Sequence, residues 1–519
     1  MKIVLISTYE LGRQPFGLVS PAAWLRKRGH EVTCLDLTRQ SLDQGAIGAA
    51  QLIAIYLPMH TATRLAAKLI PQLREQNPSA HLCCYGLYAP MNAAYLRSMG
   101  VSAILGGEFE GGLVQLAERL GSSSELGHIA GVVGGRFSGS QPAPAFEPRL
   151  EATTSETTFS DLAIPQPEPL ISLERLAFEL PDRTGMPPLP QYAHLVIPGE
   201  GYRVVGSTEA SRGCKHLCRH CPIVPVYNGV FRVVGREVVL EDIRQQVAAG
   251  AQHISFGDPD FFNGIRYAMD LVEAFHRELP QISYDVTIKI EHLRKYEEHV
   301  PRLLDTGCLF VITAVESVDD RILERLDKGH SREDFLYVAR RFRDLGMTLH
   351  PTFVPFTPWT TIEGYLDLLQ VIQAEGLTEN VAPIQLGIRL LIPRGSRLLE
   401  LNEVQSIVGS FDAESLVYPW RNEDVRLDML SHAVQTIASD ADRKKQSRSA
   451  AFTRIWEAAH AAAARPAPWL RVKTPPRPVP FLSEPWYCCA EPTRDQLVSI
   501  GGSAPAKARE AAAGADVFV

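Results

Sequence analysis

Short apolar segments alternate with amphipathic ones along two stretches of this chain, and this alternation restricts the fold more than any other feature. In the first 120 residues, apolar runs of strand length are separated by helical periodicity, clearest at residues 62–76. Apolar strands between helices of about 10 to 15 residues are typical of a parallel sheet that is covered on both faces. We therefore predict an α/β fold that begins with a doubly wound parallel sheet.

The alternation resumes at Arg203 and continues to about residue 400. Helical segments separate six further apolar runs, at 203–213, 253–257, 282–290, 309–315, 347–354 and 384–392. Strands and helices in this order predict a complete or partial (β/α) barrel of the TIM type. Enzymes with this fold keep their chemistry in the loops that follow the strands.

The remaining segments differ in composition. Pro, Ser, Thr and Glu accumulate between the two blocks, the chain after residue 400 is mainly helical, and a Pro-rich tail follows. We predict five parts: a sheet domain at 1–125, a connector at 126–200, a barrel at 201–400, a helical region at 401–465 and the tail at 466–519.

Charge and hydropathy exclude several classes of protein. The chain is 45% hydrophobic and 21% charged, with a net charge of −7, so no basic excess indicates binding to nucleic acid or to an anionic membrane. No apolar run approaches the ~20 residues of a membrane helix. The start, MKIVLISTYELG, enters a strand at once and lacks a signal cleavage site, so we expect a cytoplasmic protein.

The most informative motif is GCKHLCRHCP, which places Cys214, Cys218 and Cys221 in one loop directly after the first predicted barrel strand. Thiolates this close can converge on a soft metal. Three cysteines on a four-iron cluster leave one iron open for a small ligand. The alternative is a zinc site with His216 or His220 as a fourth ligand, but zinc sites usually take ligand pairs from separate elements.

This Cys-x3-Cys-x2-Cys loop resembles the signature of the radical S-adenosylmethionine (SAM) enzymes. The resemblance implies a [4Fe–4S] cluster, bound SAM, its reductive cleavage to a 5′-deoxyadenosyl radical, and an electron donor such as flavodoxin or ferredoxin. The main alternative to an enzyme is a non-catalytic metal-binding regulator.

Two further barrel segments resemble SAM-binding parts of that family. Gly257, Asp258 and Pro259 end the second strand where the family has a motif that meets the amino group of SAM; an ordinary strand-to-helix turn is the alternative. Glu316 and Ser317 match the family's Gly-Ile-Glu-Ser segment, in which the carboxylate can accept hydrogen bonds from the ribose or the methionine ammonium.

Other barrel residues are less decisive. Ala314 stands where that family segment often has Gly, a mild departure. Lys289 and Glu291, at the end of the third strand, either face the site or form a solvated pair.

The first domain, with LGGEFEGGL after its last strand, resembles the cobalamin-binding domain that precedes some radical SAM barrels. It lacks the Asp-x-His-x-x-Gly motif that supplies a histidine to cobalt, and reads TYELGRQPFG there. Cobalamin is therefore either held without that histidine or not bound. His60, after the third strand, is either an axial ligand or, as we favour, a surface-loop histidine.

The cobalamin question decides the expected reaction. Methyl transfer follows if cobalamin binds, and rearrangement, oxidation, or sulfur or selenium chemistry if it does not. The expected substrate is a small molecule or a peptide.

The tail carries EPWYCCAEP, which resembles the radical SAM group named for a CUAEP or CCAEP tail. In some members selenocysteine takes the position of Cys489, with Cys488 before it. We predict that Cys488 and Cys489 form a redox-active or substrate-capturing pair; burial as small hydrophobic residues is the alternative.

Overall fold

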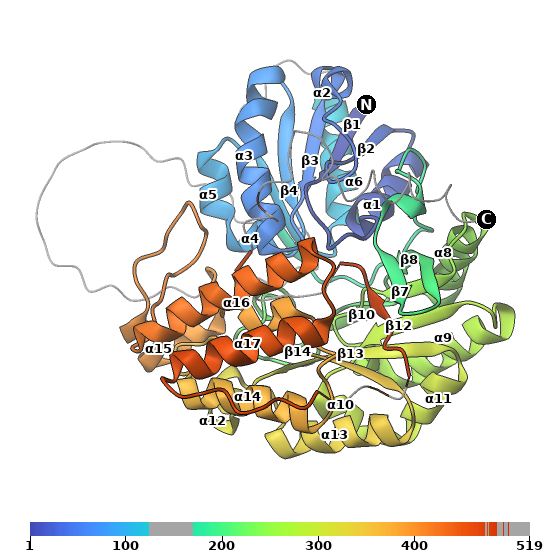
Figure 1. Cartoon of the computed structure of the whole chain (residues 1–519). Helices are drawn as coiled ribbons and strands as arrows, with labels where there is room; N and C mark the ends of the chain where they lie inside the picture. Colours follow the sequence, from blue (N-terminus) through green and yellow to red (C-terminus); the bar gives the residue numbers. More distant parts are fainter. Residues whose placement is uncertain (124–169, 473–474, 476, 485–490, 493–496, 498–519) are drawn as a thin grey trace, which may run out of the picture.

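A computed structural model describes residues 1–123, 170–472, 475, 477–484, 491–492 and 497 of the chain. The first domain is the predicted doubly wound sheet, with strand order β2-β1-β3-β4-β5-β6 and all neighbours parallel (Figure 1). Its strands are β1 (Lys2–Ser7), β2 (Glu31–Asp36), β3 (Leu52–Tyr56), β4 (His81–Tyr85), β5 (Ala103–Gly107) and β6 (Leu170–Ser172). Its helices are α1 (Phe16–Lys27), α2 (Gln44–Ala49), α3 (His60–Gln76), α4 (Tyr88–Met91), α5 (Ala93–Ser98) and α6 (Glu110–Ser123).

Strand β1 shows why these strands read as continuous apolar runs. Its residues alternate between two separate cores, with Val4 and Ile6 in the one that contains α3 and Leu5 in the one that contains α1 and α6. Both faces of the sheet are therefore buried. Strand β6, which lies within the predicted connector, pairs with β5 and extends this sheet.

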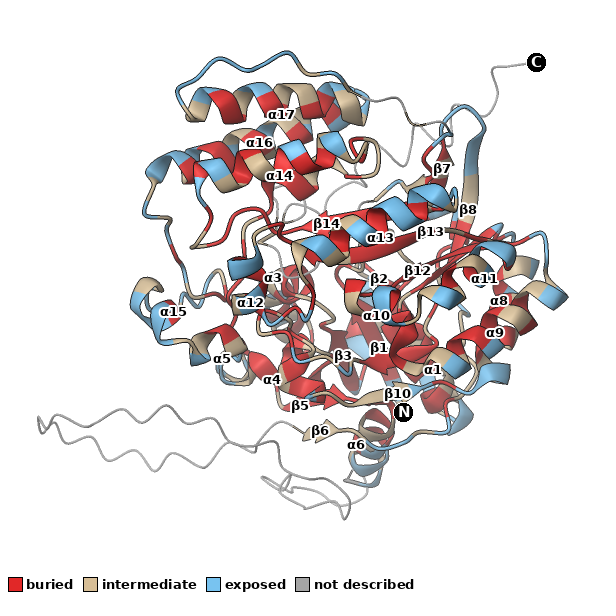
Figure 2. Cartoon of the chain, turned by 90° about the horizontal axis from the view of Figure 1, so that it is seen from below, coloured by how far each residue is buried: buried red, intermediate tan, exposed pale blue. Residues whose placement is uncertain are grey.

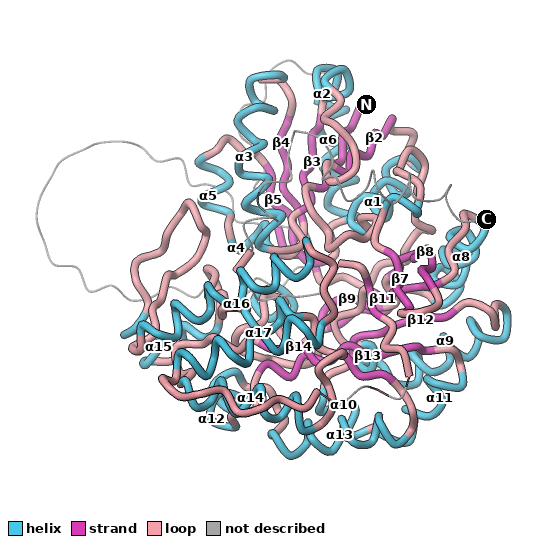
Figure 3. The backbone as a smooth tube through the Cα atoms, in the orientation of Figure 1, coloured by secondary structure: helices cyan, strands magenta, loops and turns pink. Residues whose placement is uncertain are grey.

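The second sheet curls into a partial barrel, with order β14-β13-β12-β11-β8-β7-β15 (Figure 3). Strands β8 and β11 to β14 are parallel, as predicted, while β7 and β15 are antiparallel additions at one edge. The strands are β7 (His194–Ile197), β8 (Gly201–Thr208), β11 (His253–Phe256), β12 (Ser283–Thr287), β13 (Cys308–Glu316), β14 (Thr348–Phe353) and β15 (Phe481–Leu482); a small hairpin, β9 (Ser211–Gly213) with β10 (Phe231–Val233), follows β8.

Helices cover the outside of this sheet, and its strands are largely buried (Figure 2). They are α8 (Arg236–Ala248), α9 (Ile265–Glu278), α10 (Ile290–Lys295), α11 (Val300–Asp305), α12 (Asp320–Leu326), α13 (Arg332–Asp344) and α14 (Ile362–Ala374). The short α7 (Val224–Tyr227) instead contacts β5 of the first domain. The helical C-terminal region consists of α15 (Asn402–Ile407), α16 (Val425–Arg443) and α17 (Arg448–Ala462), and α17 lies beside both α14 and α16.

The prediction of a sixth barrel strand at 384–392 is wrong. Residues Pro383–Gly387 form a 3-10 helix, and only the isolated bridge residues Arg389 and Leu390 follow it, with Arg389 in a parallel bridge to Phe356. The carbonyl of Gly387 accepts a hydrogen bond from Gln435 of α16 at 2.8 Å, so the helical region takes the group that a strand would offer to its neighbour.

Among the helices of the described residues, none combines the length and the apolar character that a membrane span requires.

Candidate active site

The three-cysteine loop begins at the carboxyl end of the barrel's first strand, and its entry is fixed by Asp258. The buried Asp258 carboxylate accepts hydrogen bonds from the Ala210 backbone at 2.9 Å and from Ser211 Oγ at 2.5 Å. Burial raises the pKa of Asp258 to about 7 despite these bonds. Gly213 follows with φ +74°, and a Cβ there would lie 2.4 Å from the Val230 carbonyl, so only glycine fits directly before Cys214.

The loop itself is held from several sides. Asn263 Oδ1 accepts from the Lys215 backbone at 3.1 Å, and the Arg219 backbone donates to the Leu326 carbonyl at 2.9 Å. Arg397, from the segment after the last barrel pairing, donates to the Leu217 carbonyl at 3.1 Å. The loop therefore has one conformation prescribed by three other parts of the barrel.

The three thiols lie close enough to interact electrostatically. Burial, together with the nearby charges of Asp260, Cys221 and Cys218, raises the pKa of Cys214 to about 12, although a hydrogen bond from the His216 backbone opposes the shift. Burial also raises the pKa of Cys218, which the Lys328 and Lys289 cations oppose. Soft thiolates gathered in one loop near cationic side chains fit an iron–sulfur cluster.

A second donor set overlaps the first. Ligand atoms of Cys214, His216 and Asp260 all lie within 4.8 Å of one another. Asp260 Oδ2 is 3.2 Å from His216 Nε2 and 2.7 Å from His292 Nδ1. The histidine of the zinc alternative thus lies beside Cys214, but His220 does not join it: its Nε2 is 3.2 Å from Glu316. Both donor sets include Cys214, so the identity of the metal that the protein binds, iron or zinc, shows which set is used.

Glu316 ends β13 in a left-handed conformation, φ +69°, next to a register shift in the strand pairing. Its Oε1 is 3.3 Å from Lys328 Nζ and 3.2 Å from His220 Nε2, and both neighbours are buried. Burial raises the pKa of Glu316, but Lys328 and His220 outweigh it and hold the pKa at about 2. The carboxylate is ionised and already paired, and its contact with SAM stays a prediction.

Sequence reasoning missed Lys328. The residue follows α12 and a left-handed Asp327, and nothing local marks it as buried. Lys289 and Glu291 do face the loop: Lys289 is buried, its Nζ is 3.1 Å from Glu291 Oε2, and that oxygen is 3.3 Å from His216 Nδ1.

The other predicted residues divide into two groups. Gly257 and Pro259 are half-exposed at the carboxyl end of β11, and the Ser317 hydroxyl accepts from the Asp319 backbone at 3.0 Å, so their contacts with SAM also stay predictions. Cys488 and Cys489 lie outside the described residues.

His60 is not the surface-loop residue that we favoured. It is 4% exposed at the start of α3, and its Nε2 lies 2.7 Å from the Ser415 carbonyl. Burial lowers its pKa to about 4, so the ring is neutral. Because a carbonyl only accepts, Nε2 carries the proton and Nδ1 keeps its lone pair.

The first domain reaches the cysteine loop through Arg212, two residues before Cys214. Its buried guanidinium contacts Glu110 at 2.7 Å and Glu108 at 3.3 Å, both at the carboxyl end of β5, and Glu209 at 2.7 Å. Tyr227, just after the loop, donates to Glu108 at 3.1 Å. Burial raises the pKa of Glu108 to about 7 although Arg212 lowers it.

Comparisons with known proteins agree with this geometry. Residues 208–369 match the model of the radical SAM superfamily. The chain therefore contains a radical SAM domain. Its fold resembles that of OxsB, a cobalamin-dependent SAM radical enzyme solved with aqua-cobalamin and SAM, with a TM-score of 0.62 at 13% identity over 85% of this chain and 67% of that one.

It also resembles the radical SAM methyltransferase TsrM from Kitasatospora setae, with a TM-score of 0.57 at 18% identity over 78% of this chain and 76% of that one. Among curated proteins, the hopanoid C-3 methylase of Methylococcus capsulatus is 23% identical over 67% of this chain and 62% of its own. The matched region thus spans less than two thirds of the length of that curated relative.

Removing Arg212 tests the link between the domains. In Arg212→Gln, buried carboxylates lose their cation, so we expect the free energy of unfolding to fall by about 3–5 kcal/mol. Thermal or urea unfolding followed by circular dichroism measures this. Arg244→Gln is the matched control, because Arg244 forms exposed pairs with Glu241 and Glu278, and its loss should cost no more than ~0.5 kcal/mol. Equal effects would contradict a structural role for Arg212.

Lys328→Met tests the pair at Glu316. The buried carboxylate would be left without its ammonium partner, so we expect the free energy of unfolding to fall by about 3–5 kcal/mol at neutral pH. Adding Glu316→Gln should restore most of this free energy. Because the pKa of Glu316 is lowered from 4.5 to about 2, its pairing stabilises the folded state above pH 4.5, and this stability is lost as the pH falls towards 2. A pH series of unfolding midpoints in which Glu316→Gln keeps the acid-side loss would contradict the assignment.

Proposed function

We propose that this protein is a cobalamin-dependent radical SAM methyltransferase acting on a small-molecule or peptide substrate, with Cys214, Cys218 and Cys221 as the ligands of a [4Fe–4S] cluster. The observation that carries the proposal is the meeting of two carboxyl edges. The cysteine loop leaves the carboxyl end of β8, and Arg212 joins it to the carboxyl end of β5. Ligands of parallel α/β sheets and barrels bind at these edges. OxsB, which shares the fold, is a cobalamin-dependent enzyme, and TsrM, which also shares it, is a methyltransferase.

When bound, the cluster would supply the electron for SAM cleavage, and cobalamin would supply the methyl carrier. The chain's own residues prepare the cluster site. Lys328 and Lys289 lower the pKa of the Cys218 thiol against the effect of burial and so favour the thiolate that binds iron. Gly257, Asp258, Pro259, Glu316 and Ser317 are the proposed SAM-binding residues, with Asp258 also fixing the entry to the loop.

The first domain has features that fit a polar ligand at its carboxyl edge. Three buried polar atoms there, Ser7 Oγ, Glu10 Oε2 and His60 Nδ1, have no hydrogen-bond partner among the described residues. Such atoms are rare in the interior of a protein and often mark a place where water or a ligand binds. Ser7 ends β1, and Glu10 and His60 follow β1 and β3, so all three lie where this fold class binds its ligands.

Three further expectations from the sequence belong to the proposal. Cys488 and Cys489 act as a redox-active or substrate-capturing pair, an electron donor such as flavodoxin or ferredoxin reduces the cluster, and the protein works in the cytoplasm without nucleic acid or membrane partners.

The cluster assignment is tested by metal content. After anaerobic reconstitution, the wild type should hold about four irons and show iron–sulfur absorbance. Cys214→Ala, Cys218→Ala and Cys221→Ala should each lose that absorbance and SAM cleavage. Cys308→Ala is the matched control, because Cys308 is a free, buried cysteine at the start of β13. Wild-type protein that holds zinc and no iron would instead support the set Cys214, His216 and Asp260.

Cobalamin binding is tested separately. The protein is incubated with hydroxocobalamin and desalted, and we expect a retained corrinoid spectrum. If His60 Nδ1 is a cobalt ligand, paramagnetic resonance of the reduced cobalt should show nitrogen hyperfine splitting that disappears in His60→Ala. Retained corrinoid without that splitting would place the ligand elsewhere. A protein that retains no corrinoid would overturn methyl transfer and favour cobalamin-free radical chemistry.

A further inference from the structure

The described parts of the C-terminal tail contact both domains. Strand β15 pairs with β7 at the edge of the barrel sheet, and the Ser483 backbone donates to the His194 carbonyl at 2.8 Å. Glu484 then accepts a hydrogen bond from Tyr9 of the first domain at 2.8 Å. Leu497 packs against Tyr9, Leu11 and residues of α3.

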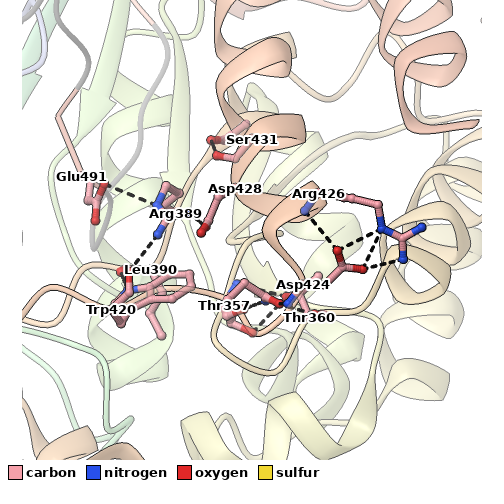
Figure 4. A network of polar contacts seen from close by, with 12 residues as sticks. Thr357, Thr360, Arg389, Leu390, Trp420, Asp424, Arg426, Asp428, Ser431 and Glu491 are labelled. Carbon is pink, nitrogen blue, oxygen red and sulfur yellow. Dashed lines mark hydrogen bonds and ion pairs between the residues drawn. The ribbon is translucent and has the colours of Figure 1, made fainter. Parts of the chain in front are cut away.

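Seven residues after Glu484, the tail contacts the barrel again, at Arg389. Glu491 Oε2 is 3.6 Å from Arg389 Nε, and the Glu491 backbone donates to the Arg389 carbonyl at 3.4 Å (Figure 4). Glu491 belongs to the Cys-Cys-Ala-Glu-Pro motif that the sequence singled out. One residue of the tail thus makes both a side-chain and a main-chain contact with the same barrel residue.

Arg389 is oriented without help from the tail. Its guanidinium carbon lies 4.2 Å from the centre of the Trp420 ring, one terminal nitrogen donates to the Trp420 carbonyl at 3.2 Å, and the other pairs with Asp428 (Figure 4). These contacts occupy both terminal nitrogens and leave Nε directed to Glu491. A guanidinium fixed in this way is a preorganised hydrogen-bond donor for a carboxylate.

Both attachment points lie just beyond the carboxyl ends of parallel strands. Tyr9 follows Ser7, the last residue of β1, and Arg389 pairs with Phe356, three residues beyond the end of β14. The described tail residues Glu484 and Glu491 therefore lie at the carboxyl ends of the strands of the two sheets, where the cysteine loop also lies.

We propose that Arg389, oriented by Trp420 and Asp428, is an intramolecular docking site for the C-terminal tail, and that Glu491 is the carboxylate it receives. The contact attaches the tail to the barrel after Glu484 has attached it to the first domain, so one segment of chain connects the carboxyl edges of both. Because the two attachments are seven residues apart, the second forms at a high effective concentration, and a partly exposed ion pair is sufficient.

Hydrogen exchange of the full-length chain, read by mass spectrometry, tests this proposal. In Glu491→Gln, amides in peptides covering residues 481–484 and 491–497 should exchange about 2- to 5-fold faster than in the wild type. Arg389→Gln should give the same increase, and the double variant no more than either single one, because both remove one contact. High salt should reproduce the effect in the wild type and add little in Glu491→Gln.

Arg426→Gln is the matched control, because Arg426 forms an exposed pair with Asp424 near Arg389 and has no hydrogen bond or ion pair with the described residues of the tail (Figure 4). Its tail peptides should exchange as in the wild type. Glu491 is 38% exposed, so Glu491→Gln does not endanger the fold even if Arg389→Gln does. Unchanged exchange in Glu491→Gln, or additive effects in the double variant, would overturn the proposal. No cluster, SAM or corrinoid is needed, so the outcome is independent of the proposed reaction.

Discussion

The arrangement of the two domains depends on the ion pairs that the buried guanidinium of Arg212 forms. Arg212 is 8% exposed and has lost most of its hydration, so only direct pairing can stabilise it there. Two of its carboxylate partners, Glu108 and Glu110, belong to the first domain, and the third, Glu209, belongs to the barrel. The segment leading into Cys214 is thus satisfied only when both domains are present. One cation faces three carboxylates, and the raised pKa of Glu108, about 7, means that a bound proton removes part of the excess negative charge near neutral pH.

A second buried ion pair shapes the opposite side of the cysteine loop. Glu316 adopts a left-handed conformation that costs a residue with a side chain roughly 1–2 kcal/mol. Strain of this kind persists where the surroundings over-determine it, and here Lys328 and His220 both hold the carboxylate. The register shift beside Ala314 turns Glu316 out of the regular strand alternation. The mild departure at Ala314 therefore lies where the strand changes direction.

The sequence predicted those features that depend on local pattern. The apolar runs of β1 to β5 predicted the parallel sheet, because a strand that is buried on both faces has no alternation of apolar and polar residues. Val4 and Leu5 show this, since they enter different cores. The three cysteines were singled out because their spacing is itself the signal, and their role as cluster ligands stays a prediction. Arg212 was not, since its partners Glu108 and Glu110 lie more than a hundred residues away in the chain. The expected sixth strand failed for a similar reason: its apolar pattern is that of a strand, but the Gly387 carbonyl is bonded to α16.

The position of the tail follows from the same geometry. In both sheets, loops follow the carboxyl ends of the parallel strands, and these ends of the two sheets meet. The loops supply polar groups, such as Tyr9 and Arg389, to a segment that passes over them. Strand β15 pairs with β7 at the edge of the barrel sheet, and the residues that follow it lead to Glu484, which lies next to Gly12 of the first domain. Gly12 has φ +67°, a backbone conformation that favours glycine, and a Cβ there would lie 2.4 Å from Glu484 Oε2, so a larger residue would have to displace the Glu484 carboxylate. Tyr9 and Gly12 of the first domain thus contact Glu484, and β15 pairs with the barrel sheet, so the described residues 481–484 belong to the folded interface between the two domains.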